Sequence, residues 1–489
     1  MSKGNELVTG EIRLQRVEEC LWEIPRQGGM RVPGRIYASE KLLAGLKEDN
    51  SLRQVMNVAH LPGIVGYSLA MPDIHWGYGF PIGGVAAVEL NDGVISPGGV
   101  GYDINCGVRL VKSHLTYSAI QQKMPKLVET LFSFIPSGVG AQGAIPKLSK
   151  GEEKRLLRGG ARWAVEQGYG RQENLDYMEE GGRLENADAE LVSDRALERG
   201  LKQVGTLGSG NHFLEIGRVD EIYLSDVAQA LGLFPDQLVV LIHTGSRGLG
   251  YQTCEDFLKV MNQAMAKYGI QLPDRQLACT PIGSREGQDY LAAMASAANY
   301  AWANRQVIMS LAEKAFWKAL NISPAELGFS LIYDVCHNIA KMEEHVVDGK
   351  RRRLCVHRKG ATRAFPPGHP QLPKAYQELG QPVLVPGDMG RYSYLLVGTE
   401  AAMEKSFGST CHGAGRVMSR AQSKRESRGI DIDQEMARRG VVARYQGRAT
   451  MAEEMPHAYK DVADVVETMD QAGISKKVAR FRPVGVIKG

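Results

Sequence analysis

The chain has 489 residues, which is enough for a large buried core and, by length alone, for about two to four domains. Its 43% hydrophobic and 23% charged content is ordinary for a globular enzyme, and a net charge of only +4 excludes a polycation that binds nucleic acid over its whole surface. Seven scattered cysteines, no basic-then-apolar leader and no apolar run of about 18 residues predict a cytoplasmic protein without a disulfide framework or a membrane span.

The N-terminal part contains a short helix, a turn with two polar residues, and a strand. Ser39 followed by Glu40–Leu43 is typical of a capped short helix. A glycine- and proline-rich turn, MPDIHWGYGFPIGG, then leads into a strand at Val85–Leu90. Asp73 and His75 lie in this turn, where either could orient a metal ligand by a hydrogen bond. A purely structural role for the histidine is the alternative.

A glycine-rich loop, GGVGYDINCGVR at Gly98–Arg109, carries a carboxylate and a thiol. The glycines exclude a regular helix, so Asp103 and Cys106 are expected in a tight loop that opens a strand at Val108–Val111. The loop therefore presents two potential metal ligands at a strand end. A buried structural cysteine beside a turn aspartate is the alternative interpretation.

The rest of the chain mixes helical and strand-like segments without regular alternation. Residues 117–200 are charged and helical in pattern, and we interpret them as a solvated helical layer. Without a repeat or a low-complexity linker, the sequence predicts a single compact α+β domain over residues 1–489, with a packed sheet core, surrounding helices and glycine loops at its rim. The later expected elements are strands at Leu238–Ile242 and Phe329–Val335, a long helix at Gln288–Leu320, a polar hairpin at Glu343–Arg353, a turn and strand at Leu384–Leu396 and charged helices over 419–444.

Three histidines are candidates to join the loop ligands. His243 and His337 each follow a predicted strand, and His212 lies in the glycine-flanked GSGNHFLE. Strand ends of one sheet share a rim, so these rings could meet Asp103 and Cys106. Five donors exceed the four that one tetrahedral zinc uses, and a bridging thiolate fits two metals suited to phosphoryl transfer. Ligand softness favours zinc over manganese. Each histidine alone could equally be structural.

His412 lies in a different glycine motif, STCHGAGR. Gly413, Gly415 and Arg416 form a bent, cationic segment that could approach a phosphate, and the imidazole could act as a nucleophile toward a nucleotide phosphorus. A histidine that caps a glycine turn is the alternative. Ser246 and Arg247 repeat the hydroxyl and guanidinium pattern and would suit a second phosphate, although no Walker loop occurs.

Taken together, the motifs DINCGVR, GSGNHFLE, HTGSRGLG, DVCHN, PGDMG, CHGAGR and the terminal PVGVIKG resemble the RtcB family of RNA ligases. The resemblance extends from about residue 60 to the C-terminus, and its motifs are long and irregular. It implies an RtcB-like fold and a ligase that uses GTP and manganese to join an RNA 3′-phosphate or 2′,3′-cyclic phosphate to a 5′-hydroxyl, in tRNA splicing or RNA repair. By the resemblance, His412 takes GMP from GTP, and GMP then passes to the RNA 3′ end.

The resemblance also assigns site residues, and its manganese replaces the zinc that ligand softness predicts. Cys106 bridges two manganese ions; Asp103 and His212 complete one ligand set, and His243 and His337 the other. Glu215 and Lys488 would read the guanine edge. The positions that match the GTP site are Asn211, His212, Phe213, Leu214, Glu215, His337, Asn338, Pro386, Gly387, Asp388, Met389, Ser393, His412, Gly413, Ala414, Gly415, Tyr459 and Lys488.

Arg247, Arg416 and Arg420 are candidates for contacts with RNA phosphates. The sequence departs from the family at Asp388, where many members carry serine, which alters the hydrogen bonding expected around the triphosphate. We expect a monomer that binds RNA ends and GTP, with an activating protein as a further partner. Two alternatives are a dinuclear metallophosphoesterase that hydrolyses RNA phosphate ends without nucleotide and a non-catalytic RNA-binding subunit.

Overall fold

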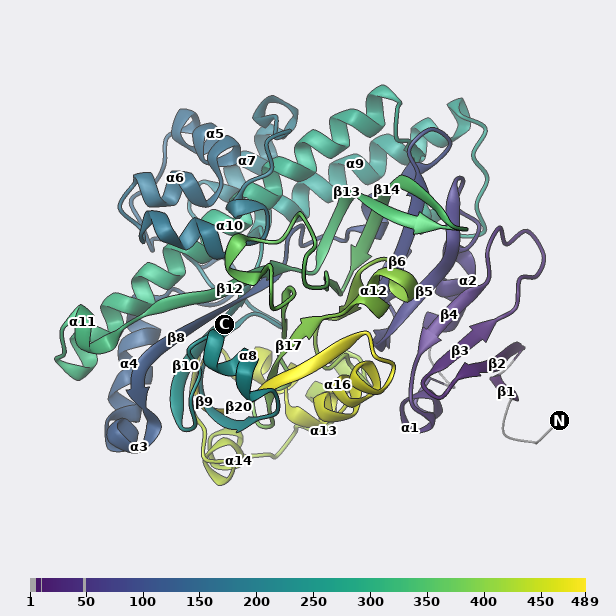
Figure 1. Ribbon diagram of the computed structural model, residues 1–489. Helices are drawn as coiled ribbons and strands as arrows, with labels where there is room; N and C mark the ends of the chain where they lie inside the picture. The colour runs from purple at the N-terminus through teal and green to yellow at the C-terminus, as the bar shows by residue number, and fades with distance from the viewer. Residues whose placement is uncertain (1–5, 10, 47–49) are drawn as a thin grey trace.

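The structure, a computed structural model, describes residues 6–9, 11–46 and 50–489 (Figure 1). Two eight-stranded sheets form its core and helices surround them, so the expected α+β class is confirmed. The expectation of no leader peptide concerns residues 1–10, which lie partly outside the described ranges. Among the described residues, no helix combines the length and apolar character needed to cross a bilayer.

The first sheet joins the N-terminal strands to a hairpin from the second half of the chain. Its neighbours are antiparallel except for the parallel pair β4 and β5. In spatial order its strands are β1 (Glu6–Thr9), β2 (Ile12–Glu18), β3 (Leu21–Ile24), β4 (Gly34–Tyr37), β5 (Ile64–His75), β6 (Ile82–Glu89), β14 (Lys350–Lys359) and β13 (Asn338–Val347).

The second sheet holds the strands predicted at Val108–Val111, Leu238–Ile242, Phe329–Val335 and within Leu384–Leu396, whereas the one predicted at Val85–Leu90 is β6 of the first sheet. Its short strand β19 (Val442–Tyr445) pairs in parallel with the last strand. The main order is β12 (Ser330–Cys336), β8 (Gly107–Thr116), β10 (Gln237–Thr244), β9 (Phe213–Ile222), β20 (Ser475–Lys488), β17 (Ser393–Gly398) and β16 (Pro382–Val385). Two further pairs are β7 (Val94–Ile95) with β11 (Thr280–Pro281) and β15 (Ala361–Arg363) with β18 (Ser409–Cys411).

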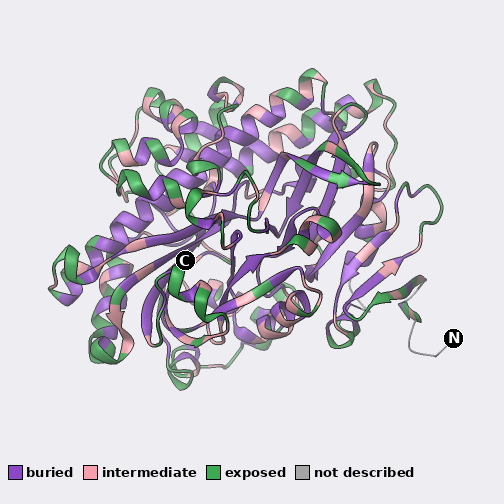
Figure 2. Ribbon diagram, in the orientation of Figure 1, coloured by how far each residue is buried: buried purple, intermediate pink, exposed green. Residues whose placement is uncertain are grey.

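The helices cover the sheets, and the longest, α10 (Arg285–Leu320), is buried along most of its length (Figure 2). The Ser284 hydroxyl caps its first turn, and Asn321 ends it in the left-handed region at φ 56°. An alanine-rich helix without a polar face must be buried on all sides. The other helices are α1 (Glu40–Ala44), α2 (Ser51–Val58), α3 (Tyr117–Ile120), α4 (Met124–Phe134), α5 (Lys150–Gly159), α6 (Ala161–Glu166), α7 (Asp194–Gly200), α8 (Ser225–Ala230), α9 (Arg247–Lys267), α11 (Pro324–Leu327), α12 (Glu400–Ser406), α13 (Arg420–Glu426), α14 (Ile432–Arg438), α15 (Arg448–Glu453) and α16 (Val462–Gln471).

Most predicted elements are present, with three corrections. The predicted turn around Asp73 and His75 is the end of strand β5, because both residues pair or pack within the first sheet. The charged stretch 419–444 is helical only as far as 438 and then enters β19. The region 117–200 is helical and turn-rich as expected, but it is not merely a solvated layer, since Leu131, Leu156 and Trp163 lie in the main core.

Candidate active site

The five predicted metal ligands lie together at one rim of the second sheet. Strands β12, β8, β10 and β9 are neighbours there, and each ligand stands at or beside a strand end. Cys106 directly precedes β8, His212 directly precedes β9, and His337 directly follows β12. His243 lies inside β10 rather than after it, paired with Phe213 of β9. The expectation that strand ends bring these groups to a common rim is confirmed.

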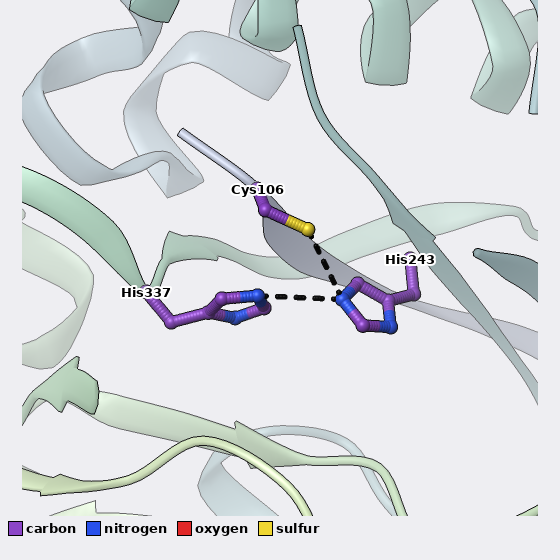
Figure 3. Close-up of side chains that lie close together, drawn as sticks. All are labelled: Cys106, His243 and His337. Atoms are coloured by element: carbon purple, nitrogen blue, oxygen red, sulfur yellow. Dashed lines mark hydrogen bonds between the residues drawn. The ribbon is translucent and has the colours of Figure 1, made fainter. Parts of the chain in front are cut away.

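Their side chains form two groups of three that share the thiol. Cys106 Sγ lies 3.3 Å from His243 Nε2, and His243 Nε2 lies 3.3 Å from His337 Nε2 (Figure 3). On the other side, the same sulfur lies 3.5 Å from His212 Nε2, which is 2.8 Å from Asp103 Oδ2. In each group the donor atoms are all within 4.8 Å of one another. The geometry is that of a potential metal-binding cluster with a central sulfur.

The protonation states of these side chains suit the binding of divalent cations. Burial lowers the pKa of His243 and His337 well below the ordinary value of 6.5, so both rings are neutral and offer lone pairs. Burial alone would raise the pKa of Asp103, but His212 lowers it to about 2, so this carboxylate is charged. Burial and then Asp103 raise the pKa of the Cys106 thiol well above 9.0. A bound cation would supply the positive charge that this thiol needs to ionise.

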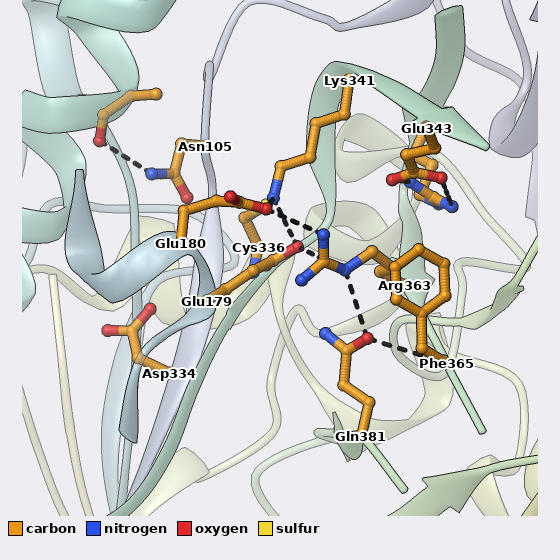
Figure 4. A network of polar contacts seen from close by, with 12 residues as sticks. Asn105, Glu179, Glu180, Asp334, Cys336, Lys341, Glu343, Arg363, Phe365 and Gln381 are labelled. Atoms are coloured by element: carbon orange, nitrogen blue, oxygen red, sulfur yellow. Dashed lines mark hydrogen bonds and ion pairs between the residues drawn. The ribbon is translucent and has the colours of Figure 1, made fainter. Parts of the chain in front are cut away.

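A buried arginine of α10 holds the loop that carries Asp103 and Cys106. Arg305 donates to the backbone oxygens of Asn105 at 2.8 Å and Thr244 at 2.9 Å, and its guanidinium pairs with Asp334 at 2.8 Å. Asn105 is in the left-handed region at φ 52°, and its side-chain amide donates to the Ala298 oxygen at 2.7 Å. Figure 4 labels Asn105 and Asp334 and draws the hydrogen bond that the Asn105 amide donates. The loop that carries Asp103 and Cys106 is therefore held in place by hydrogen bonds to α10.

A second buried network fixes the strand end before His337. The Glu179 carboxylate accepts the backbone N–H of Cys336 at 2.8 Å and pairs with Lys341 at 2.7 Å and Arg363 at 3.4 Å (Figure 4). Burial would raise the pKa of Glu179, but Lys341 and Arg363 lower it, so the group is charged. This carboxylate comes from the region that the sequence suggested was only a surface layer.

His412 follows β18 and is held by a carboxylate that comes from β5. The Asp73 Oδ2 atom accepts from the ring Nδ1 of His412 at 2.6 Å, from its backbone N–H at 2.9 Å and from the N–H of Gly413 at 3.2 Å. Burial would raise the pKa of Asp73, but contacts with His412 lower it, so this carboxylate is charged, and Nε2 is the ring nitrogen of His412 that does not bond Asp73. The sequence suggested that Asp73 could orient a metal ligand by a hydrogen bond; in the structure it orients His412 instead. The His412 ring centroid lies 4.7 Å from that of His337.

These groups line one cavity of about 1520 Å³. All the predicted site residues line it except Leu214, which is buried in the main core, and Ser393, which stands behind Glu215. Ser246, expected at a second phosphate, instead donates its backbone N–H to Asp103 at 3.0 Å. The predicted residues on the cavity wall are Asp103, Cys106, Asn211, His212, Phe213, Glu215, His243, Arg247, His337, Asn338, Pro386, Gly387, Asp388, Met389, His412, Gly413, Ala414, Gly415, Arg416, Arg420, Tyr459 and Lys488.

The two residues expected to read guanine are both buried. Glu215 accepts from the Ser393 hydroxyl at 3.0 Å, and burial raises its pKa to about 8. Burial lowers the pKa of Lys488 to about 8; its nearest carboxylate is that of Glu454, at 4.0 Å. At Asp388, where the sequence departs from the family, the carboxylate bonds the N–H of Gly390 at 2.9 Å and burial raises its pKa.

The three arginines expected to contact RNA differ in availability. Arg420 is 55% exposed at its side chain and lies 3.5 Å from Glu454. Arg416 is already engaged, by Glu454 at 3.1 Å and by two backbone oxygens. Arg247 is held at a positive φ of 55° and contacts the Thr206 hydroxyl at 3.3 Å. Of the three, Arg420 is the most accessible to a polyanion.

Comparison with known proteins identifies the family. A family model described as tRNA-splicing ligase RtcB matches residues 54–489. Proteins named tRNA-splicing ligase RtcB from Archaeoglobus fulgidus, Methanococcus maripaludis and Thermococcus kodakarensis are 54%, 52% and 51% identical to this chain. These alignments cover 97%, 97% and 98% of this chain and 99% of each relative. Since the match extends over nearly the whole length at this level of identity, the chain belongs to the RtcB family.

Proposed function

We propose that the protein is an RNA ligase that uses GTP and manganese to join an RNA 3′-phosphate, or a 2′,3′-cyclic phosphate, to a 5′-hydroxyl. The observation that carries the proposal is the juxtaposition of a carboxylate-held histidine, His412, with two ligand groups that share the Cys106 thiol. The family membership and the names of the relatives support RNA as the substrate. Their name also supports split tRNA halves as one natural substrate.

The two ligand groups would hold the manganese ions. Asp103 and His212 would offer ligands in one group, His243 and His337 in the other, and Cys106 belongs to both. When bound, the two cations offset the negative charge of the phosphates and of the departing groups. The neutral imidazoles and the charged Asp103 described above support this assignment, because ligands must offer lone pairs.

His412 is the nucleophile of the first step. Its Nδ1–H is donated to Asp73, so Nε2 attacks the α-phosphorus of GTP. An N–P bond forms, the bond from that phosphorus to the bridging oxygen breaks, and pyrophosphate leaves. The imidazole gains positive charge, which the Asp73 carboxylate stabilises from 2.6 Å. Glu215 and Lys488 orient the guanine.

Two transfers complete the reaction. A 3′-phosphate oxygen attacks the GMP phosphorus, the N–P bond breaks and His412 is regenerated. The 5′-hydroxyl oxygen then attacks the RNA phosphorus, its proton passes to solvent, and GMP leaves as the phosphodiester forms. GMP is needed because a phosphate monoester lacks a good leaving group. Water first opens a cyclic phosphate end to the 3′-phosphate.

The proposal is tested by incubating the protein with manganese and with GTP that carries a label at its α-phosphate. We expect an acid-labile, base-stable GMP adduct in the wild type and none in His412→Ala. His412→Asn should also block labelling, yet join RNA whose 3′ end already carries GMP. Wild-type protein that never becomes labelled but hydrolyses RNA phosphate ends would contradict the proposal and identify a metallophosphoesterase.

A further inference from the structure

Three tyrosines and an arginine form a continuous column on the cavity wall. The Tyr78 and Tyr102 rings meet edge to face at 5.5 Å, and the Tyr102 and Tyr251 rings stack at 4.7 Å with 23° between their planes. The Arg199 guanidinium carbon lies 5.1 Å from the centre of the Tyr251 ring. All four side chains line the same cavity as His412, although they come from separate segments of the chain.

The column begins beside the metal-ligand cluster and ends in solvent. Tyr102 directly precedes Asp103, and Tyr251 lies one helical turn after Arg247 in α9. Tyr251 is 45% exposed, and Trp76, on the same cavity wall as Tyr78, is 59% exposed. Exposed aromatic rings gathered in one cavity mark a binding surface more strongly than rings scattered singly over a protein.

The ligand that this wall suits has flat faces and negative charge. Rings stack on nucleobases of any sequence, and guanidinium planes do the same. Arg247, on the wall of the same cavity, supplies positive charge for phosphates. The residues assigned to guanine, Glu215 and Lys488, lie on β9 and β20, so the column is left for a second set of bases.

We propose that the column from Tyr102 through Tyr251 to Arg199, together with the exposed Trp76 of the same cavity, forms a stacking platform for nucleobases of the single-stranded RNA ends that are joined. The inference rests on the proposed ligase function and adds how the RNA is held. Bases in a duplex are already stacked and paired, so they cannot reach the platform. The enzyme therefore binds unpaired nucleotides next to the junction, with little sequence preference.

The variant Tyr251→Ala tests the platform. Stacking is worth about 1–3 kcal/mol per base, so we expect the KM for RNA to rise about 5- to 150-fold while labelling by GTP keeps its rate. Tyr251→Phe keeps the ring and should restore the wild-type KM. Phe234→Ala removes an exposed ring outside the cavity and controls for the loss of any surface aromatic group.

Substrates with one abasic nucleotide near the junction separate stacking from a structural effect. In the wild type, an abasic site at the position facing the platform should raise the KM by the same factor as Tyr251→Ala. In Tyr251→Ala the same abasic site should raise the KM for RNA by less than about twofold, because the ring on which the base would stack is already absent. An equal abasic penalty in both proteins would overturn the proposal.

An unchanged KM in Tyr251→Ala and Trp76→Ala would also overturn it and would assign the exposed rings to a protein partner instead. Failure of the ligase function itself is recognised separately, because wild-type protein would then take no label from GTP. Normal labelling with no platform effect refutes only the platform.

Discussion

A single added methyl group at Gly245 tests whether Asp103 must keep its place for the cation cluster to form. Gly245 follows β10, and its backbone φ is one that alanine adopts freely. An added Cβ would lie 2.3 Å from Asp103 Oδ1 and 2.6 Å from both Cγ and Oδ2. Ordinary contact begins near 3.4 Å, so the carboxylate must move by about 1 Å. That shift breaks its 2.8 Å contact with His212.

We expect Gly245→Ala to lower the rate of GMP labelling about 100-fold, the cost typical of a 1 Å misplacement. Manganese affinity should fall about 10- to 100-fold, as when the support of a ligand is lost. Titration calorimetry with manganese and labelling with GTP measure the two effects. Gly283→Ala is the matched control, because nothing lies within 4 Å of its added Cβ. Wild-type manganese affinity in Gly245→Ala would refute the assignment of Asp103.

Two further predictions concern buried carboxylates. Asp73→Asn should slow GMP labelling about 10²- to 10⁴-fold, because the amide cannot stabilise the charge that the His412 ring gains. The manganese content measured by atomic absorption should not change. Loss of the metal as well would mean that Asp73 supports the cation cluster. Glu215→Gln should change the pH dependence of stability, because burial raises the pKa of Glu215 from 4.5 to about 8 and the folded state keeps a proton that the unfolded chain releases. The stability that this proton contributes is complete below about pH 4.5 and is lost as the pH rises toward about 8, by up to about 1.4 kcal/mol per pH unit. Urea denaturation at several pH values in this range gives the free energy of unfolding, which should fall less steeply with pH in the variant than in the wild type. An identical pH dependence in the two proteins would contradict the burial argument.

The ligand cluster was predictable because its residues sit next to strong local signals. Cys106 and His337 adjoin apolar runs that can only be buried strands, and strand ends of one sheet must share a rim. The long helix at Gln288–Leu320 was predictable for the same reason, and the structure extends it by three residues to Arg285, where Ser284 supplies the cap. Local patterning thus predicted where the ligand cluster lies, whereas the GTP-site positions came only from the resemblance to the family.

The supports of the site were not predictable, because they depend on contacts between distant segments. Asp73 and His412 are separated by 339 positions, and Glu179 and Cys336 by 157. Nothing near Glu179 in the sequence distinguishes it from the solvated glutamates of the same helical region. Its burial follows from the packing of that region against the end of β12, which only the tertiary fold establishes.

A buried ionic network of Arg109, Arg305 and Asp334 lies next to the ligand cluster. Arg109 and Arg305 share the single carboxylate of Asp334, and all three side chains are fully buried, so one positive charge is left over below Cys106. A buried ion network of this kind often costs stability relative to apolar packing. Here Arg305 opposes the rise that burial and Asp103 cause in the pKa of the Cys106 thiol. An apolar floor would remove this opposing charge and leave the thiol harder to ionise.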